Sequence, residues 1–541
     1  MLKIALAQIN SLVGAMHANQ IKIIETAQYA RDQLTADIVV FPELSVTGYP
    51  PEDLLLRPDF IIQAKQAVLA IAQAVQGIDI VLGFPEQIDN CLYNSAVVLR
   101  DAKIFKRYQK IALPNFGVFD EKRYFQSGKK SCIFLVKNTA IGITICEDIW
   151  QKGLIEKNRE KGAELIITLN ASPFYAGKIH QREAIVCQQA KESGLALVYV
   201  NAVGGQDELI FDGASFAVNG QGEVAFRAEE FVEQVSVVEF ANNSLVPTAC
   251  APLYSIISSE YKALVLGVRD YVHKNGFQGA LLGLSGGIDS ALVLAIAVDA
   301  LGADHVEAVL MPSKYTQDMS NEDARLEAEA LGVKYHVIAI EPAVTAFNEM
   351  LSELFAGSKK DTTEENIQAR CRGVLLMAIS NKQGKLLLTT GNKSEMSVGY
   401  ATLYGDMAGG FAPIKDVPKL LVYQLAEYRN TLSTVIPQRV ITRPPSAELA
   451  PDQIDEDSLP AYAILDPILE MYVEQDKSAK EIQAAGYQLA DINRAISLVD
   501  RNEYKRRQAP PGIRITPRAF GRDRRYPITS GYNGMRQIDV N

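Results

Sequence analysis

The chain is poor in the residues that build metal centres and disulfide frameworks. Its 541 residues include six cysteines, five histidines and one tryptophan. The cysteines lie far apart with no C-x-x-C pair, and the histidines show neither H-x-x-x-H nor H-E-x-x-H spacing. We therefore expect neither a structural zinc site nor a set of disulfide bonds.

Long apolar runs are also missing. No run approaches the ~18–20 residues that a membrane-spanning helix needs, and the first apolar stretch is interrupted by Gln8, Asn10 and Ser11. We expect no signal peptide, no membrane partner and a cytoplasmic location. With 48% hydrophobic residues, 22% charged residues and a net charge of −10, the composition indicates two or more packed domains.

The first part of the chain alternates short apolar segments with helical patterns. Six segments rich in Ile and Val are typical of buried strands: 3–9, 36–43, 79–86, 140–148, 163–170 and 195–203. Residues 92–136 and 207–239 instead show strand after strand with little helix between them. This mixture predicts a mixed sheet or a sandwich rather than a simple parallel sheet.

Periodicity lapses at 241–257, and we place a domain boundary there, giving domains 1–245 and 246–541. Beyond it, apolar segments at 279–285, 305–312, 334–340 and 385–390 alternate with helical patterns. Regular alternation of strand and helix is typical of a doubly wound parallel sheet.

The C-terminal tail is basic in an otherwise acidic chain. Such a run fits a solvated face, a nucleic-acid patch, or docking against phosphates or against the acidic body. Because Pro and Gly turns interrupt it, we favour docking and expect no nucleic-acid partner. The basic residues are Arg501, Lys505, Arg506, Arg507, Arg514, Arg518, Arg522, Arg524 and Arg525.

The strongest local motif is LGLSGGIDS at 282–290, which leaves an apolar strand and enters a helical pattern. Its glycines let the backbone approach an anion closely, and the amides at a helix N-terminus bind phosphate. Asp289 could hold a metal ion. A plain glycine turn would explain Gly286 and Gly287, but not the whole Ser-Gly-Gly-x-Asp-Ser string at the carboxyl end of a strand, where open α/β sheets bind ligands.

This string resembles the pyrophosphate loop, SGGxDS, of the ATP pyrophosphatases, which cleave ATP between its α- and β-phosphates. The motif indicates the chemistry but not the substrate. Four further segments, 363–373, 389–416, 443–462 and 502–529, resemble the NAD synthetases, and GNKSE at 391–395 is similar to the longer, glutamine-using members. The resemblance implies a Rossmann-like ATP-pyrophosphatase domain.

The resemblance also implies the roles of individual residues. ATP-binding residues would be Leu284, Ser285, Gly286, Gly287, Ile288, Asp289, Ser290 and Thr390. Deamido-NAD-binding residues would be Asn366, Arg370, Glu395, Asp406 and Lys505, and Asp289 and Glu395 would bind Mg²⁺ that accompanies ATP. Each residue also has an ordinary structural interpretation: Glu395 could start a helix, Arg370 could pair with Glu364 or Glu365, and Thr390 could cap a strand.

In the first domain, three groups follow predicted strands: Glu43 in VVFPELSVTGYP, Lys110 in KRYQKIALPNF and Cys146 in IGITICEDIW. They resemble the Glu–Lys–Cys triad of the nitrilase superfamily, which hydrolyses amides on an αββα sandwich. The resemblance implies that the Cys146 thiolate attacks glutamine, that Glu43 transfers the proton and that Lys110 stabilises the oxyanion.

The same resemblance implies a glutamine pocket formed by Phe116, Ser172 and Lys178. Relatives often carry Tyr in place of Phe116, so a hydroxyl contact is missing here, and loss of glutamine use would leave an ammonia-only enzyme. Glu121 has two interpretations, a second active-site carboxylate or an exposed charge beside Lys122.

Together the two domains resemble the glutamine-dependent NAD synthetases. This implies a ligase whose substrates are deamido-NAD, ATP and L-glutamine, with a shielded ammonia passage and a homo-oligomeric assembly. An ATP pyrophosphatase acting on RNA would need a catalytic cysteine pair or an RNA-binding appendage. A non-catalytic nucleotide-binding or scaffold protein would not need an intact Glu43, Lys110, Cys146 and SGGIDS.

Overall fold

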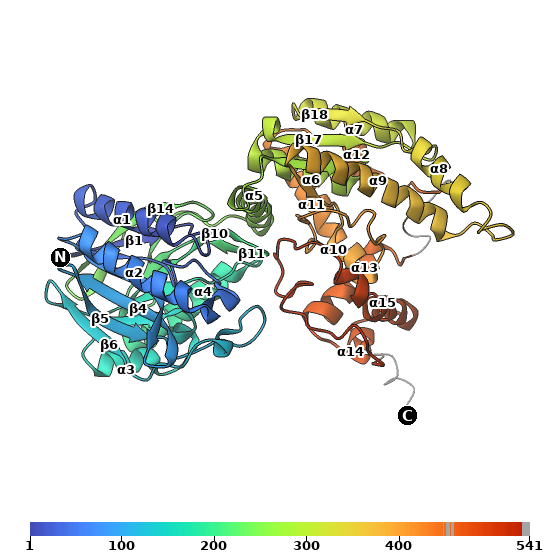
Figure 1. Ribbon diagram of the computed structural model, residues 1–541. Coiled ribbons are helices and arrows are strands. Elements are labelled where there is room, and N and C mark those ends of the chain that lie inside the picture. The colour runs from blue at the N-terminus through green and yellow to red at the C-terminus, as the bar shows by residue number, and fades with distance from the viewer. Residues whose placement is uncertain (447, 451–454, 456–458, 533–541) are drawn as a thin grey trace. The chain divides into compact units, whose positions relative to one another are not determined.

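The computed structural model describes residues 1–446, 448–450, 455 and 459–532. The chain divides into two compact units, Met1–Ile256 and Ile257–Asn541 (Figure 1). This division lies slightly later than the boundary at 245/246 that the sequence analysis proposes. Strand β15 (Ser244–Val246) still pairs with β14 (Gln234–Ala241), and Cys250 forms a bridge with Arg227, so this segment remains attached to the first unit.

The first unit contains two mixed sheets. One has the order β15-β14-β1-β2-β3-β4-β5 and the other the order β13-β12-β9-β8-β7-β6. Besides β14 and β15, the first of these sheets contains β1 (Leu2–Gln8), β2 (Ile38–Val40), β3 (Asp79–Ile88), β4 (Cys91–Arg100) and β5 (Lys103–Gln109). The second comprises β6 (Cys132–Val136), β7 (Thr139–Ile145), β8 (Leu165–Asn170), β9 (Ala196–Asn201), β12 (Phe216–Val218) and β13 (Val224–Arg227), and a hairpin joins β10 (Val203–Gln206) to β11 (Leu209–Asp212).

Alternation along the strands places the two sheets face to face. On β1, Ile4 and Leu6 pack in a core shared with Ile143 and Ile145 of β7, whereas Ala5 faces the helical side. Helices α1 (Met16–Asp32) and α2 (Pro58–Ala74) cover the outside of one sheet, and α3 (Leu154–Glu160) and α4 (Lys178–Ser193) cover the other. The predicted αββα sandwich is confirmed.

The second unit has a four-stranded parallel sheet in the order β18-β17-β16-β19. Its strands are β16 (Ala280–Gly283), β17 (Val306–Leu310), β18 (Lys334–Val337) and β19 (Leu386–Leu388). Neighbouring helices are α5 (Ile256–Lys274), α6 (Ile288–Leu301), α7 (Asp318–Ala330), α8 (Glu341–Leu351), α9 (Thr362–Gln383) and α11 (Lys419–Leu432). The strand order reverses at β16, which places a ligand crevice at its carboxyl end and confirms the predicted doubly wound sheet.

The last part of the described chain is mostly helical up to Arg506, and residues 507–532 after it form turns and irregular segments. Its elements are α10 (Lys393–Val398), α12 (Gln438–Thr442), α13 (Tyr462–Leu469), η6 (Glu470–Glu474), α14 (Ala479–Ala484), α15 (Leu489–Arg501) and α16 (Glu503–Arg506). Basic tail residues pair with carboxylates of the same unit: Arg506 and Arg524 with Glu503, and Arg514 with Asp523. Among the described helices, none has both the length and the apolar character required to cross a membrane.

Candidate active sites

Two residues of the predicted triad, Glu43 and Lys110, come together after strands and are joined by Glu121. Lys110, which follows β5, donates from Nζ to Glu43 Oε1 at 2.7 Å and to Glu121 Oε1 at 2.8 Å. Asn94 Nδ2 at 2.7 Å and the Ala171 amide at 3.2 Å donate to the two oxygens of Glu43. All three charged side chains are buried, so a single ammonium lies between two carboxylates away from water.

Cys146 follows β7 directly and begins the short helix η3 (Cys146–Trp150). Its φ of +44° is in the left-handed region, which a non-glycine residue adopts at a cost and which is common at functional sites. Burial raises the pKa of the Cys146 thiol, and Glu43 raises it further while Lys110 lowers it. The thiol therefore keeps its proton in the free protein, and attack requires a base.

Glu121 lies on the short helix η2 (Glu121–Arg123) and is buried, so the interpretation as an exposed charge is wrong. Its Oε1 accepts from Lys110 and, at 3.1 Å, from the hydroxyl of Tyr49. Burial raises the pKa of Glu121 to about 7, although Lys110 opposes the shift. A carboxyl with this pKa can exchange a proton near neutral pH.

The three residues predicted for the glutamine pocket have different surroundings. Ser172 is buried beside the Ala171 amide that binds Glu43, and its own amide donates to Asn201 Oδ1 at 2.9 Å. Lys178 Nζ lies 4.4 Å from the centre of the Trp150 ring. Phe116 is 60% exposed, and its ring meets Phe119 edge-on. The structure therefore places Ser172 near the triad but leaves Phe116 at the surface.

The SGGIDS loop of the second unit links β16 to α6. Gly286 has φ +79°, and a Cβ there would lie 2.2 Å from the Ser320 carbonyl oxygen, so only glycine fits. Ser285 Oγ accepts from the Gly287 amide at 3.1 Å and lies 3.0 Å from Ser290 Oγ. The loop thus has a fixed shape at the N-terminus of a buried helix, where an anion is favoured.

A cavity of about 610 Å³ opens in front of this loop. Glu395 and Asp406 lie on its walls. The walls also include every predicted ATP-site residue except Gly286, namely Leu284, Ser285, Gly287, Ile288, Asp289, Ser290 and Thr390. The carbonyl of Gly286 instead accepts from Arg443, another cavity residue.

Three other residues predicted to bind deamido-NAD, Asn366, Arg370 and Lys505, contact segment 399–406 beside the cavity. Asp406 is part of this segment. Asn366 Oδ1 accepts from the Thr402 hydroxyl at 2.8 Å, and Asp406 Oδ1 accepts from the Thr402 amide at 2.8 Å. Arg370 donates to the Leu403 carbonyl at 3.2 Å, and Lys505 donates to the carbonyls of residues 399 and 401 at 2.8 Å each. Within the predicted segment 443–462, residues 447, 451–454 and 456–458 lie outside the described residues.

Two family models match the chain, carbon-nitrogen hydrolase over residues 3–249 and NAD synthase over residues 260–509. The glutamine-dependent NAD(+) synthetase of Xanthomonas campestris pv. campestris is 51% identical over 99% of this chain and 98% of its own. That of Acinetobacter baylyi is 50% identical over 98% of each chain. The solved Acinetobacter baumannii enzyme in complex with ADP is 48% identical, with a TM-score of 0.80 over 97% of this chain and 98% of its own.

The chain belongs to the glutamine-dependent NAD(+) synthetases. It is accordingly an ATP-using ligase that amidates deamido-NAD to NAD with nitrogen from glutamine. The roles of its individual residues stay predictions.

In this synthetase, the cavity also contains a cation that the sequence analysis missed. Lys419 Nζ, 1% exposed, lies 2.5 Å from Asp289 Oδ2 and 3.7 Å from Glu395 Oε1. Burial lowers the pKa of Lys419, but the two carboxylates outweigh burial and raise it. The available signal was its position after Pro418 at the start of a helix, three residues beyond the segment that resembles the family motif.

Asp289 and Glu395 also have the composition of a site for Mg²⁺. Burial and the neighbouring Asp289 raise the pKa of Glu395 to about 8, although Lys419 opposes the shift. The described residues form no group of three or more His, Cys, Asp or Glu that could hold an ion by themselves. Because Mg²⁺ commonly binds one or two carboxylates together with substrate phosphates, this pair fits an ion that arrives with ATP.

Proposed function

We propose that the two units divide the synthesis of NAD between them. The first unit releases ammonia from glutamine, and the second unit activates deamido-NAD with ATP. The observation that carries this proposal is that one chain holds both a buried Glu43–Lys110–Cys146 cluster and a cavity bordered by a rigid SGGIDS loop.

In the first unit, Cys146 attacks the carboxamide carbon of glutamine while Glu43 takes the thiol proton. Lys110 stabilises the negative charge that develops on the carbonyl oxygen. Glu43 then returns the proton to the leaving nitrogen, which departs as ammonia and leaves a thioester. Water hydrolyses the thioester to glutamate and regenerates the thiol. The raised pKa of Cys146 fits this sequence, because a thiol that keeps its proton needs a base such as Glu43 to become a nucleophile.

In the second unit, a carboxylate oxygen of the nicotinate group of deamido-NAD attacks the α-phosphorus of ATP, and pyrophosphate leaves. Ammonia then attacks the activated carbonyl carbon, and AMP leaves as NAD forms. Amides and hydroxyls of Ser285–Ser290 bind the departing pyrophosphate, and Lys419 balances its charge. Asp289 and Glu395 hold Mg²⁺, which supplies further positive charge to the phosphates when bound.

For deamido-NAD we propose the residues gathered around segment 399–406. Asn366, Arg370 and Lys505 contact this segment. Asp406 belongs to it and also faces the cavity. Glu395, on the cavity wall, would contact the dinucleotide or the ion.

For assembly we propose a homo-oligomer. Apolar side chains of α8 and α9 are exposed in the single chain: Met350 at 69%, Val374 at 67% and, just after α8, Leu354 at 76%. A second copy of this chain would remove them from water. Light scattering should give a mass above one chain, and Leu354→Glu should lower it; a monomer in the wild type contradicts this proposal.

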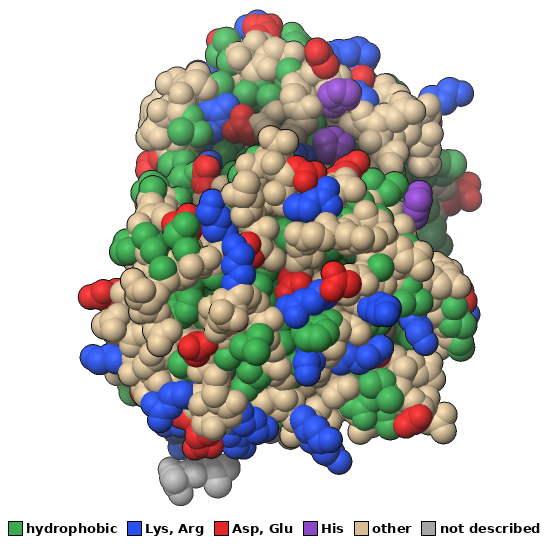
Figure 2. Space-filling model, turned by 90° about the vertical axis from the view of Figure 1, so that its left-hand side faces the viewer, with side chains coloured by type: hydrophobic (Ala, Val, Ile, Leu, Met, Phe, Trp, Pro, Cys, Tyr) green, Lys and Arg blue, Asp and Glu red, His purple; other side chains and the backbone are tan. Residues whose placement is uncertain are grey.

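For partners and location we propose small-molecule substrates, no nucleic acid, and the cytoplasm. All six cysteines are free thiols, which fits a reducing compartment. On the face shown in Figure 2, Lys and Arg side chains are scattered among acidic and apolar ones. Unchanged NAD formation in the presence of tRNA would agree with the absence of a nucleic-acid partner.

The test uses the purified chain with deamido-NAD, Mg²⁺-ATP and either glutamine or ammonium. AMP, pyrophosphate and NAD should form in equal amounts from either nitrogen source. Asp289→Ala should stop NAD formation from both sources while glutamine hydrolysis continues. Normal NAD formation in that variant contradicts the assignment of the ATP site.

A further inference from the structure

A buried lysine beside the ATP cavity has no part in the proposed chemistry. Lys393 is the first residue of α10, is 4% exposed and does not line the cavity. Its Nζ lies 2.6 Å from Glu474 Oε1, 2.8 Å from Asp416 Oδ1 and 2.7 Å from Thr516 Oγ1. It also donates to the Arg518 carbonyl at 3.0 Å. Burying an ammonium is costly, and this one is fully surrounded by acceptors.

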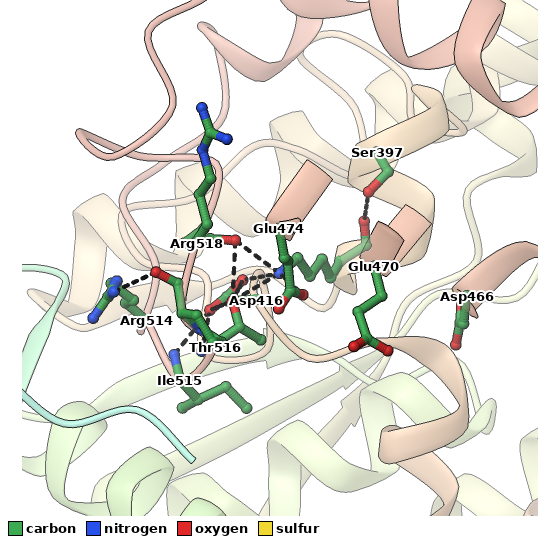
Figure 3. Close-up of polar contacts among 12 residues, drawn as sticks. Ser397, Asp416, Asp466, Glu470, Glu474, Arg514, Ile515, Thr516 and Arg518 are labelled. Carbon is green, nitrogen blue, oxygen red and sulfur yellow. Dashed lines mark hydrogen bonds and ion pairs between the residues drawn. The ribbon is translucent and has the colours of Figure 1, made fainter. Parts of the chain in front are cut away.

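The acceptors come from three separate parts of the unit. Asp416 lies just before α11, Glu474 ends η6, and Thr516 lies in the C-terminal tail. Figure 3 shows these three side chains turned toward one another, with the tail backbone alongside. Asp416 Oδ2 also accepts from the amides of Ile515 at 2.9 Å and Thr516 at 2.8 Å. The ammonium and Asp416 therefore fasten the tail to the segments that precede α11 and begin α10.

These two segments carry Glu395 and Lys419 of the ATP site, whereas Asp289 lies on α6. Asn392, next to Lys393, caps α10. Its side-chain Nδ2 donates to Asp289 Oδ1 at 2.8 Å, and its backbone amide donates to Glu395 Oε2 at 3.1 Å. The Lys393 amide donates to the Val417 carbonyl at 2.9 Å, two residues before Lys419. A shift of Lys393 would therefore displace Glu395 and Lys419 relative to Asp289.

The fastened tail also forms part of the cavity wall. Ala509 and Pro510 line the cavity, the Pro511 carbonyl accepts from the Ala412 amide at 2.9 Å, and the Pro510 carbonyl accepts from Lys415 Nζ at 2.7 Å. Loss of the contact between Thr516 and Lys393 would therefore also loosen this part of the cavity wall.

We propose that Lys393 is a positioning residue for the ATP-dependent step. Its ammonium joins the tail at 510–518 to the segments that carry Glu395 and Lys419, and thereby fixes the arrangement of these groups around the phosphates. It touches no substrate. Because a misplacement of about 1 Å at a reacting centre can lower the rate about 100-fold, loss of this joint should reduce turnover much more than substrate binding.

The test compares three variants of the full chain with ammonium as the nitrogen source. Lys393→Met removes the ammonium. Thr516→Val removes one hydroxyl from the joint without leaving a buried charge unpaired. Lys385→Met is the control, because Lys385 is a partly buried lysine that pairs with Glu307 at the sheet, outside this joint. The readouts are kcat, KM for ATP and for deamido-NAD, thermal unfolding, and glutamine hydrolysis by the first unit.

We expect kcat to fall about 100-fold in Lys393→Met and about tenfold in Thr516→Val, with each KM changed less than about threefold. Glutamine hydrolysis should remain, and Lys385→Met should keep kcat within about twofold of wild type even if it unfolds at a lower temperature. A folded Lys393→Met with wild-type kcat, or an equal loss in Lys385→Met, overturns the proposal. If Lys393→Met does not fold, Thr516→Val decides, and its kcat at the wild-type value overturns the proposal.

Discussion

Replacing Lys110 with methionine removes the only cation that the described contacts place between Glu43 and Glu121. Both carboxylates are buried, and each lies within 2.8 Å of Lys110 Nζ. Breaking a buried ion pair by removing one partner costs about 3–5 kcal/mol, so Lys110→Met should be distinctly less stable. The loss of oxyanion stabilisation should lower the rate of glutamine hydrolysis by about 10²–10³-fold.

The pH dependence of this variant has a definite sign. The pKa of Glu121 is about 7 in the folded chain, compared with the ordinary value of 4.5 that applies in the unfolded chain. Between those values the folded state binds more protons than the unfolded state, so this group lowers the free energy of unfolding as the pH rises. Without Lys110 the pKa of Glu121 rises further, and the loss of stability continues above pH 7. The difference in Tm between wild type and variant should therefore grow from pH 5 to pH 9.

The assay measures glutamate release, ammonium-dependent NAD formation and Tm in the same preparations. Lys106→Met is the matched control, because Lys106 lies on the same strand β5 and is exposed. Ammonium-dependent synthesis should persist in Lys110→Met at temperatures below its Tm. Glutamine hydrolysis within about tenfold of wild type, or a Tm difference that shrinks as the pH rises, would refute the reasoning.

The second unit supports three further predictions. Gly286→Ala should abolish NAD formation from either nitrogen source, since its Cβ would meet the Ser320 carbonyl at 2.2 Å, whereas Gly287→Ala, whose nearest contact is 3.3 Å, should retain most of it; equal loss in both contradicts the fixed loop shape. The pKa of Glu395 is about 8, so we expect Mg²⁺ binding near neutral pH to release a proton from this carboxyl. The Mg²⁺ concentration for half-maximal activity should therefore fall from pH 7.5 to pH 9, and calorimetry that detects no proton release contradicts this. Lys419→Met should lower ammonium-dependent kcat about 100-fold and leave glutamine hydrolysis unchanged, and loss of both activities would argue for general damage.

Much of the fold followed from local pattern. The apolar segment at 279–285 and the helical pattern at 289–301 correspond to β16 (Ala280–Gly283) and α6 (Ile288–Leu301). The segment at 334–340 was predicted as one strand, but β18 ends at Val337 and α8 begins at Glu341. A run of apolar residues does not distinguish a strand from the turn that follows it, so the end of this strand could not be predicted.

The residues of the site could be predicted where a sequence motif contains them. They could not be predicted where contacts join distant segments of the chain. Glu43, Lys110 and Cys146 each follow a strand, so their convergence was visible in outline. The burial of Glu121 was not, because a single turn of helix within a loop has no periodicity that reveals which side is covered. Lys393 and Lys419 depend on contacts with residues about 80 to 130 positions away, which local pattern does not encode.

The central claim is that Cys146 serves only the supply of ammonia, while the second unit makes NAD. The most direct measurement is NAD formation by wild type and Cys146→Ala with glutamine or with ammonium, while AMP is assayed. We predict that the variant loses glutamine-dependent synthesis but keeps ammonium-dependent synthesis, with one AMP for each NAD. Retained glutamine-dependent synthesis in Cys146→Ala, or loss of both activities in a folded variant, would contradict the division of the reaction between the two units.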